Sequence, residues 1–187
     1  MPRWMPQAKE RLRDAAIELS AERGYENVTV TDITERAGLT RRTYSRYFTD
    51  KRDAFFAGME QLAAAVGAAA VEADESLGPW DAAVVALRTV GDQLVQFVPT
   101  AELRRQVIRT SPELQERERT KAALVAGSLA EALRGRGAPA PLAGVLAEVG
   151  VIAFNAAFDR WLDDPEGAAY SERFDAVVAE LTQALDS

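Results

Sequence analysis

The sequence contains no cysteine and no histidine. Their absence excludes disulfide bonds, thiolate nucleophiles, histidine general bases, and zinc sites built from either residue. Carboxylates alone could hold magnesium or calcium, but no segment has the Asp/Asn-rich spacing around a central glycine that a calcium loop requires. We therefore expect no metal, no cofactor and no catalytic site, so the chain is not expected to be an enzyme.

Long hydrophobic runs are scarce as well. The longest uncharged stretch of low polarity, residues 61–71, is alanine-rich and much shorter than a membrane span. The first six residues lack the apolar segment and the cleavage site of a secretory signal. We expect no membrane partner and a cytoplasmic location.

Strand signals are missing too, because no segment alternates β-branched or aromatic residues between turns. Helical periodicity runs almost throughout and predicts an all-α fold of about nine helices. The first is expected over residues 7–23, followed by two short helices that end before residues 38 and 48. The later helices are expected over residues 51–74, 79–98, 101–109, 112–134, 141–163 and 166–185, each delimited by proline, glycine or an Asp-Pro step.

The net charge of −7 argues at first against nucleic acid, but the charge is distributed unevenly. Residues 1–52 carry 11 Lys and Arg against 8 Asp and Glu, whereas the remaining residues have a net charge of −10. A weakly basic segment before a strongly acidic one is expected if only the first approaches phosphates. The chain is long enough for one domain or two, and this pattern favours two, residues 1–52 and 53–187.

The basic segment has the signals of a helix-turn-helix. Its first helix carries one apolar stripe and is stopped by Gly24. Thr29 can cap the next helix, with Asp32 returning a bond to the Thr29 amide. Thr40 can cap the third helix after a turn that contains Gly38. The stripe consists of Leu12, Ala15, Ala16 and Leu19.

Residues 12–56 resemble the DNA-binding domain of the TetR family. The order and spacing of its short motifs match throughout. The resemblance implies a ligand-responsive transcriptional repressor that binds a palindromic or pseudo-palindromic operator as a homodimer and is released by a small-molecule effector. The matching motifs are Glu22-Arg23-Gly24-Tyr25, Val28-Thr29-Val30-Thr31-Asp32-Ile33, Ala37-Gly38-Leu39-Thr40, Thr43-Tyr44-Ser45-Arg46-Tyr47-Phe48 and Lys51.

Candidate DNA contacts follow from the third helix and from the resemblance. Arg41 and Arg42 lie in its first turn, where an arginine fork can read the paired acceptors of guanine. The resemblance adds Thr31 as a base contact. It also implies phosphate contacts, which position the domain without reading sequence. The phosphate candidates are Thr40, Tyr47 and Lys51, with Thr29 and Thr43 as weaker ones.

Other readings of these residues remain open. The basic residues could form only a solvated cationic face, which would be the better interpretation outside a capped pair of helices. These residues are Arg41, Arg42, Arg46 and Lys51. Tyr44 is assigned to the core, whereas Tyr47 could serve either packing or phosphate contact. At Ser45 the family often has an aromatic residue that faces DNA, so Ser45 is kept as a contact but no operator sequence can be transferred from a relative.

A homodimer is expected because one short recognition helix buries too little surface for tight specific binding. The last two helices are the candidate interface, which in the family forms a four-helix bundle. Small residues such as Gly144 and Ala156 permit close approach of helices. Packing within one chain could explain about half of the apolar positions, which are Leu142, Val145, Val149, Ile152, Phe174, Val177, Val178 and Leu181.

The remaining helices are expected to enclose an effector pocket, although each candidate residue alone could be ordinary core. Asn155 stands in an apolar run, so its amide is expected to be buried and to need a partner, which could be a ligand, a backbone group or its symmetry mate. A faint resemblance to the mycofactocin-regulator branch, carried by residues 109–114 and 160–162, favours a lipophilic effector. The candidate lining is Phe56, Trp80, Phe97, Arg109, Phe154, Asn155 and Phe158.

Two other functional classes were weighed. A helical enzyme or carrier would need a catalytic pair, and the only candidate, Asp163-Asp164, diverges in direction at a turn before Pro165. A regulator that activates transcription, or that needs no ligand, is not distinguished from a repressor by the sequence.

Overall fold

The computed structural model describes residues 5–95 and 100–186, and in these ranges the chain is helical without a strand. The all-α fold class is therefore confirmed. The described helices divide into two compact units, each of which combines two separate stretches of sequence. The predicted functional boundary at residue 52 stays a prediction, because the units reflect packing alone.

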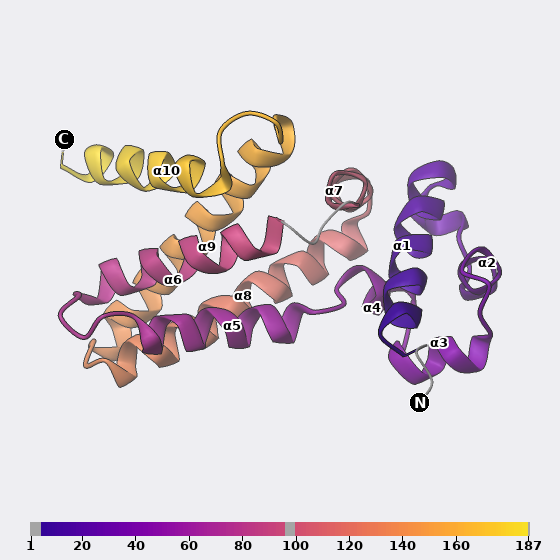
Figure 1. Cartoon of the computed structure of the whole chain (residues 1–187), viewed down its shortest axis with the longest axis horizontal. Coiled ribbons are helices and arrows are strands. Elements are labelled where there is room, and N and C mark those ends of the chain that lie inside the picture. Colours follow the sequence, from indigo (N-terminus) through magenta and orange to yellow (C-terminus); the bar gives the residue numbers. More distant parts are fainter. Residues whose placement is uncertain (1–4, 96–99, 187) are drawn as a thin grey trace. The chain divides into compact units, whose positions relative to one another are not determined.

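The first unit consists of Met1–Ala57 together with Pro99–Thr120. Helix α1 packs against α2, α3, α4 and α7, and its predicted apolar stripe is fully buried. The unit thus adds a later segment, residues 99–120, to the helix-turn-helix. Its elements, shown in Figure 1, are α1 (Met5–Arg23), the 3-10 turn η1 (Tyr25–Asn27), α2 (Val30–Arg36), α3 (Arg41–Tyr47), α4 (Lys51–Phe55), α7 (Ala101–Thr110) and the start of α8 (Pro112–Gly135).

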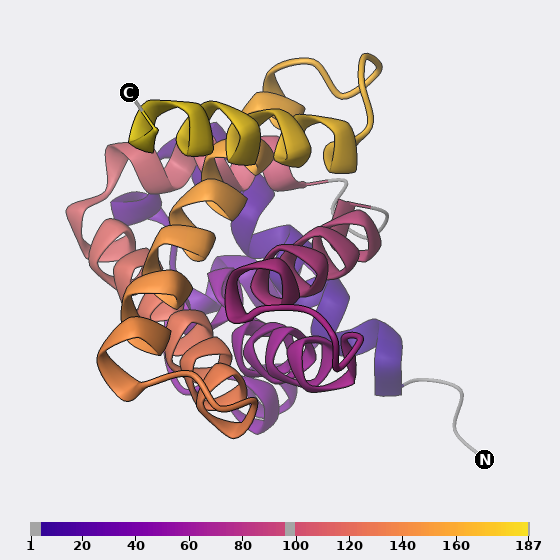
Figure 2. The same cartoon turned by 90° about the vertical axis from the view of Figure 1, so that its left-hand side faces the viewer.

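The second unit consists of Gly58–Val98 together with Lys121–Ser187. Helix α6 is its central element, since it packs against α5, α9 and α10, and Figure 2 shows α5 and α6 side by side. The rest of α8 completes the unit. The remaining helices are α5 (Met59–Glu72), α6 (Pro79–Leu94), α9 (Ala140–Asp163) and α10 (Tyr170–Leu185).

Small side chains dominate the core of the second unit and let the helices approach closely. A Cβ atom added at Gly67 on α5 would lie 2.5 Å from the Ser128 hydroxyl on α8. A Cβ added at Gly91 would lie 1.9 Å from the ring of Tyr170, so the start of α10 fits directly onto α6. Phe154, whose ring centroid lies 5.6 Å from that of Tyr170, belongs to the aromatic cluster at this place.

One predicted helix is wrong. The segment 51–74 is not continuous: α4 ends at Phe55, and α5 begins at Met59 after Gly58, whose φ of +93° lies in the left-handed region that glycine adopts readily. The described chain therefore has ten helices instead of about nine. The last helix also starts later than expected, at Tyr170.

Helix α9 is long and apolar enough to cross a membrane by length and composition, the one such helix in the described ranges. Its buried side, including Ala147, Val151 and Phe154, supplies the core of the second unit instead. A core helix passes the same test, so the apolar character of α9 is accounted for by packing.

Candidate nucleic-acid interface

Both short helices of the helix-turn-helix begin at the threonines predicted to cap them. The Thr29 hydroxyl accepts a hydrogen bond from the Asp32 amide at 3.2 Å, and the Asp32 carboxylate accepts one from the Thr29 amide at 2.8 Å. The Thr29 hydroxyl also donates to the Asp32 carboxylate, and this bond, followed by the one from the Thr29 amide, holds the pKa of Asp32 below its usual value. At α3 the Thr40 hydroxyl accepts from the Thr43 amide at 3.1 Å. The predicted caps are confirmed, including the reciprocal pair at α2.

Arginine side chains fasten the two helices to their surroundings. Arg36 on α2 binds the Glu22 carboxylate on α1 through both terminal nitrogens, at 2.9 and 2.7 Å. Arg11 donates to the carbonyl of Ala37, next to Gly38, whose φ is +62°. The turn between α2 and α3 is therefore held by α1 as well as by its own backbone.

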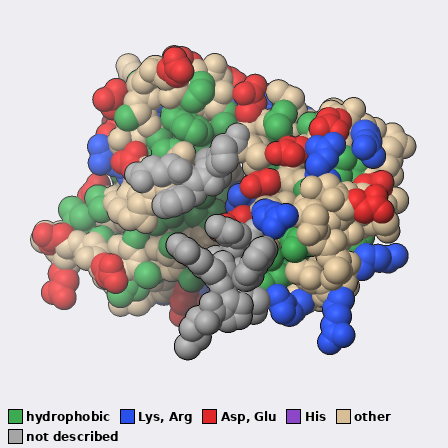
Figure 3. Space-filling model, turned by 45° about the vertical axis from the view of Figure 1, so that its right-hand side comes forward, with side chains coloured by type: hydrophobic (Ala, Val, Ile, Leu, Met, Phe, Trp, Pro, Cys, Tyr) green, Lys and Arg blue, Asp and Glu red, His purple; other side chains and the backbone are tan. Residues whose placement is uncertain are grey.

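The recognition helix α3 separates a buried side from an exposed one. Tyr44 is 2% exposed, as predicted, and its hydroxyl donates to the carbonyl of Asp50 at 2.9 Å. Arg41 and Arg42 are exposed, and neither makes a hydrogen bond or an ion pair within the part of the chain that the structure describes. Figure 3 shows Lys and Arg side chains along the lower right of the surface. Two unpaired cations on the first turn of α3 can meet phosphate or base edges.

The remaining predicted DNA contacts lie at varied depths. Thr31 and Ser45 are exposed, whereas Thr43 is half-buried. Tyr47 is also half-buried, and its hydroxyl accepts a bond from Arg46 at 3.0 Å. Their roles at DNA stay predictions, and their placement on α2 and α3 is compatible with them.

Lys51 has a structural role that the sequence did not indicate. Its ammonium donates to the carbonyls of Tyr25 at 2.5 Å and Val28 at 2.9 Å, and it lies 3.8 Å from the centre of the Tyr25 ring. Burial lowers the pKa of Lys51 from its ordinary value. The side chain thus joins α4 to the turn between α1 and α2, whereas its predicted phosphate contact stays a prediction.

Six of the seven predicted pocket residues lie in the described ranges, and they belong to both units. Phe56 is buried in the first unit, and Arg109 is exposed there. In the second unit Trp80 is half-buried on α6, while Phe154 and Phe158 both contact Tyr170. Phe97 lies outside the described residues.

In the single chain Asn155 lies outside the core, and its contact with a ligand or with its symmetry mate stays a prediction. Its side chain is exposed, because the buried side of α9 is formed by the neighbouring positions Phe154 and Ala157. An apolar run therefore did not identify the buried face of the helix.

A groove of about 730 Å³ lies in the second unit between α5 and α8. None of the six predicted pocket residues that the structure describes lines it. Small residues form most of its lining, a composition that could not be distinguished from ordinary core in the sequence. The lining residues are Ala64, Gly67, Ala68, Val71, Glu75, Leu77, Ser128, Glu131, Ala132, Gly135 and Arg136.

Comparison with known families gives a match over residues 12–58, to the model described as bacterial regulatory proteins, tetR family. Among curated proteins, none matches the chain.

Solved structures with a similar fold share little sequence with this chain. A TetR-family transcriptional regulator from Syntrophomonas wolfei has 15% identity and a TM-score of 0.64, covering 97% of this chain and 96% of its own. The complex of SmeT with triclosan has 15% identity and a TM-score of 0.63, covering 93% and 91%. FadR of Thermus thermophilus in complex with lauroyl-CoA has 19% identity and a TM-score of 0.56, covering 93% of each chain. At these identities the similarity shows a shared fold.

Replacing Lys51 with Met tests its structural role. The change leaves two carbonyls without their donor, so we expect the free energy of unfolding to fall by about 1–3 kcal/mol. Urea unfolding followed by circular dichroism measures the change. Arg42→Met is the matched control, because Arg42 is exposed and is expected to shift stability by less than about 0.5 kcal/mol. Unchanged stability of the Lys51 variant together with weaker DNA binding would mean that phosphate contact is its main role.

Proposed function

Because residues 12–58 match the model of bacterial regulatory proteins of the tetR family, we propose that the chain is a transcriptional repressor of this family that reads operator DNA through α3. The observation that carries the proposal is the pair of exposed, unpaired guanidinium groups of Arg41 and Arg42 on a doubly capped helix pair. Arginine at the N-terminal turn of a recognition helix suits the O6 and N7 acceptors of guanine. Repression, as opposed to activation, rests on the resemblance.

Operator reading is tested by fluorescence anisotropy with the DNA that flanks the gene. Arg41→Ala is expected to cost about 1–3 kcal/mol of binding free energy and to relax the base preference at one position in each half-site. Arg119→Ala, which removes an exposed arginine of α8, serves as the control and is expected to bind as the wild type does. Titrations at two salt concentrations separate phosphate contacts from base contacts. Wild-type binding that is absent, or equal on all sequences, would contradict the proposal.

We infer that the repressor is a homodimer joined through α9 and α10. Apolar side chains on α9 recur at alternating intervals of three and four residues, which is the spacing of a seam between packed helices. Three of them are strongly exposed in the single chain: Leu142 at 45%, Val145 at 60% and Ile152 at 66%. A stripe of this kind favours contact with another apolar surface. The full stripe is Leu142, Val145, Val149, Ile152 and Ala156.

Helix α10 contributes less free apolar surface than the sequence suggested. Phe174 is fully buried, and Val177 and Val178 pack against the core of their own unit. These positions support the intramolecular alternative that accounted for part of the apolar pattern. The proposed interface therefore depends mainly on α9. The end of α10, the next helix along the chain, adds Leu185, which is 77% exposed.

Placing a charge in the stripe tests the dimer. Ile152→Asp would bury a carboxylate in the seam, so we expect a monomer in sedimentation velocity at micromolar concentration. Val71→Asp is the matched control, because Val71 is 62% exposed but belongs to α5. A wild-type monomer, or equal dissociation of both variants, would rule out the α9 interface.

An effector is proposed to bind the groove between α5 and α8. Its volume of about 730 Å³ lies within the usual range for small-molecule sites. The mostly apolar lining suits a lipophilic molecule, while Glu75, Glu131 and Arg136 offer polar contacts at its edge. The similar folds of SmeT and FadR hold triclosan and lauroyl-CoA, respectively, which supports an apolar ligand. The predicted residues Phe56, Trp80, Phe97, Arg109, Phe154, Asn155 and Phe158 remain an alternative site.

Filling the groove tests this location, with triclosan and lauroyl-CoA as probes. A bound probe should raise the melting temperature of the wild type and release it from DNA. Ala68→Trp occupies the groove and should abolish both effects, whereas Ala65→Trp, on the same helix outside the lining, should retain them. Retention of both effects in the Ala68 variant would show that the effector binds elsewhere. If neither probe affects the wild type, these two ligands are excluded.

A further inference from the structure

Helix α4 is too short to fix its own direction. It has five residues, and a helix of this length gains little from its own hydrogen bonds. Its orientation must therefore come from contacts at both ends and along its sides. The structure shows such contacts with two different parts of the first unit.

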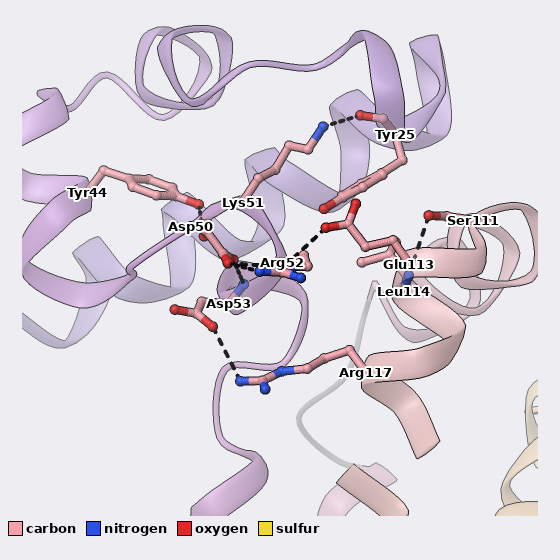
Figure 4. A network of polar contacts seen from close by, with 10 residues as sticks. All are labelled: Tyr25, Tyr44, Asp50, Lys51, Arg52, Asp53, Ser111, Glu113, Leu114 and Arg117. Carbon is pink, nitrogen blue, oxygen red and sulfur yellow. Dashed lines mark hydrogen bonds and ion pairs between the residues drawn. The ribbon is translucent and has the colours of Figure 1, made fainter. Parts of the chain in front are cut away.

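The first set joins α4 to the helix-turn-helix. Asp50 caps α4, and its carbonyl accepts the hydrogen bond from the Tyr44 hydroxyl of the recognition helix. The amide of Thr49 donates to the Asp53 carboxylate at 2.9 Å. Together with the Lys51 bonds to Tyr25 and Val28, these contacts connect α4 to α3 and to the turn between α1 and α2 (Figure 4).

The second set joins α4 to the start of α8. The Arg52 guanidinium lies 3.2 Å from the Glu113 carboxylate, and Arg117 lies 3.5 Å from the Asp53 carboxylate. Figure 4 shows these pairs between the two segments. Because the side chains of Arg52 and Glu113 are nearly half exposed, water and salt weaken this pair.

Arg104 on α7 makes the best-shielded contact with α4. Its side chain is only 21% exposed. The guanidinium donates to the carbonyl of Phe55, the last residue of α4, at 2.8 Å, and to the Glu118 carboxylate at 2.5 Å. It also lies 4.9 Å from the centre of the Phe56 ring. A cation at the carboxyl end of a helix, held by a second charged group and an aromatic face, is a strong and directional tie.

We propose that Arg104 is a positioning residue for DNA recognition: it fixes the carboxyl end of α4, and through Asp50 and Tyr44 it fixes the angle of the recognition helix. The inference rests on the proposed function of α3. Arg104 acts through α4 and Glu118 and not as one of the DNA contacts. Operator specificity consequently depends on a side chain that lies 63 and 62 positions beyond Arg41 and Arg42 in the sequence.

The test compares Arg104→Met with wild type on two duplexes, the flanking operator DNA and a scrambled sequence of equal length. We expect about a tenfold loss of operator affinity, while affinity for the scrambled duplex changes by less than about twofold, because phosphate contacts remain. A residue that only stabilises the fold would lower both affinities together. Arg119→Met is the matched control and should bind both duplexes like the wild type.

A second variant and a measurement without DNA complete the test. Glu118→Gln removes the anchor of Arg104, and the double variant should lose no more operator affinity than Arg104→Met alone, since the two residues act as one unit. Hydrogen exchange of residues 41–55 should be faster in Arg104→Met than in wild type, with exchange in α1 unchanged. Additive losses, a parallel loss on both duplexes, or unchanged exchange would overturn the inference. If the wild type binds both duplexes equally, the proposed function fails. The exchange rates of residues 41–55 still decide whether Arg104 holds α4: faster exchange in Arg104→Met supports this role, and unchanged exchange contradicts it.

Discussion

Backbone carbonyls at the ends of short helices need donors, and in this protein long basic side chains supply them. Lys51 binds the carbonyls of Tyr25 and Val28, Arg11 binds that of Ala37, and Arg104 binds that of Phe55. In the second unit Arg136 binds three carbonyls, of Ala73, Asp74 and Leu77. An unsatisfied carbonyl in a partly buried turn costs free energy, so each of these cations determines where a helix ends and how the next one begins.

Because several basic side chains bind groups within the chain, the excess of basic residues does not translate directly into a surface for phosphate. The excess of basic residues over residues 1–52 suggested a surface for phosphate, yet Arg11, Arg36 and Lys51 are engaged within the chain. The charges that remain available on the recognition helix are those of Arg41 and Arg42. The excess of basic residues in this segment therefore overstates the number of cationic groups that remain free to meet phosphate.

Structural features that depend on residues close in sequence were predicted correctly. The caps at Thr29 and Thr40 and the buried Tyr44 follow from patterns within a few residues, and all three are found. The break between α4 and α5 was missed because the apolar pattern continues across it, although Gly58, with its positive φ, stands directly before α5. Asn155 is exposed in the single chain, and the sequence did not show this because an apolar run does not say which side of a helix faces the core.

Contacts between distant parts of the sequence left no signal. The bond from Arg104 to Phe55 spans 49 positions, and nothing near either residue indicates the other. For the same reason the grouping of residues 99–120 with residues 1–57 could not be foreseen.

That grouping also sets an order of events during synthesis. The chain emerges from the ribosome with its amino terminus first, so the helix-turn-helix is exposed before α7 and the start of α8 exist. Its contacts with Arg104, Glu113 and Arg117 can form only after about 50 to 65 further residues have been added. The helix-turn-helix is thus made early, but its contacts are completed late, when α5 and α6 of the second unit have already been translated.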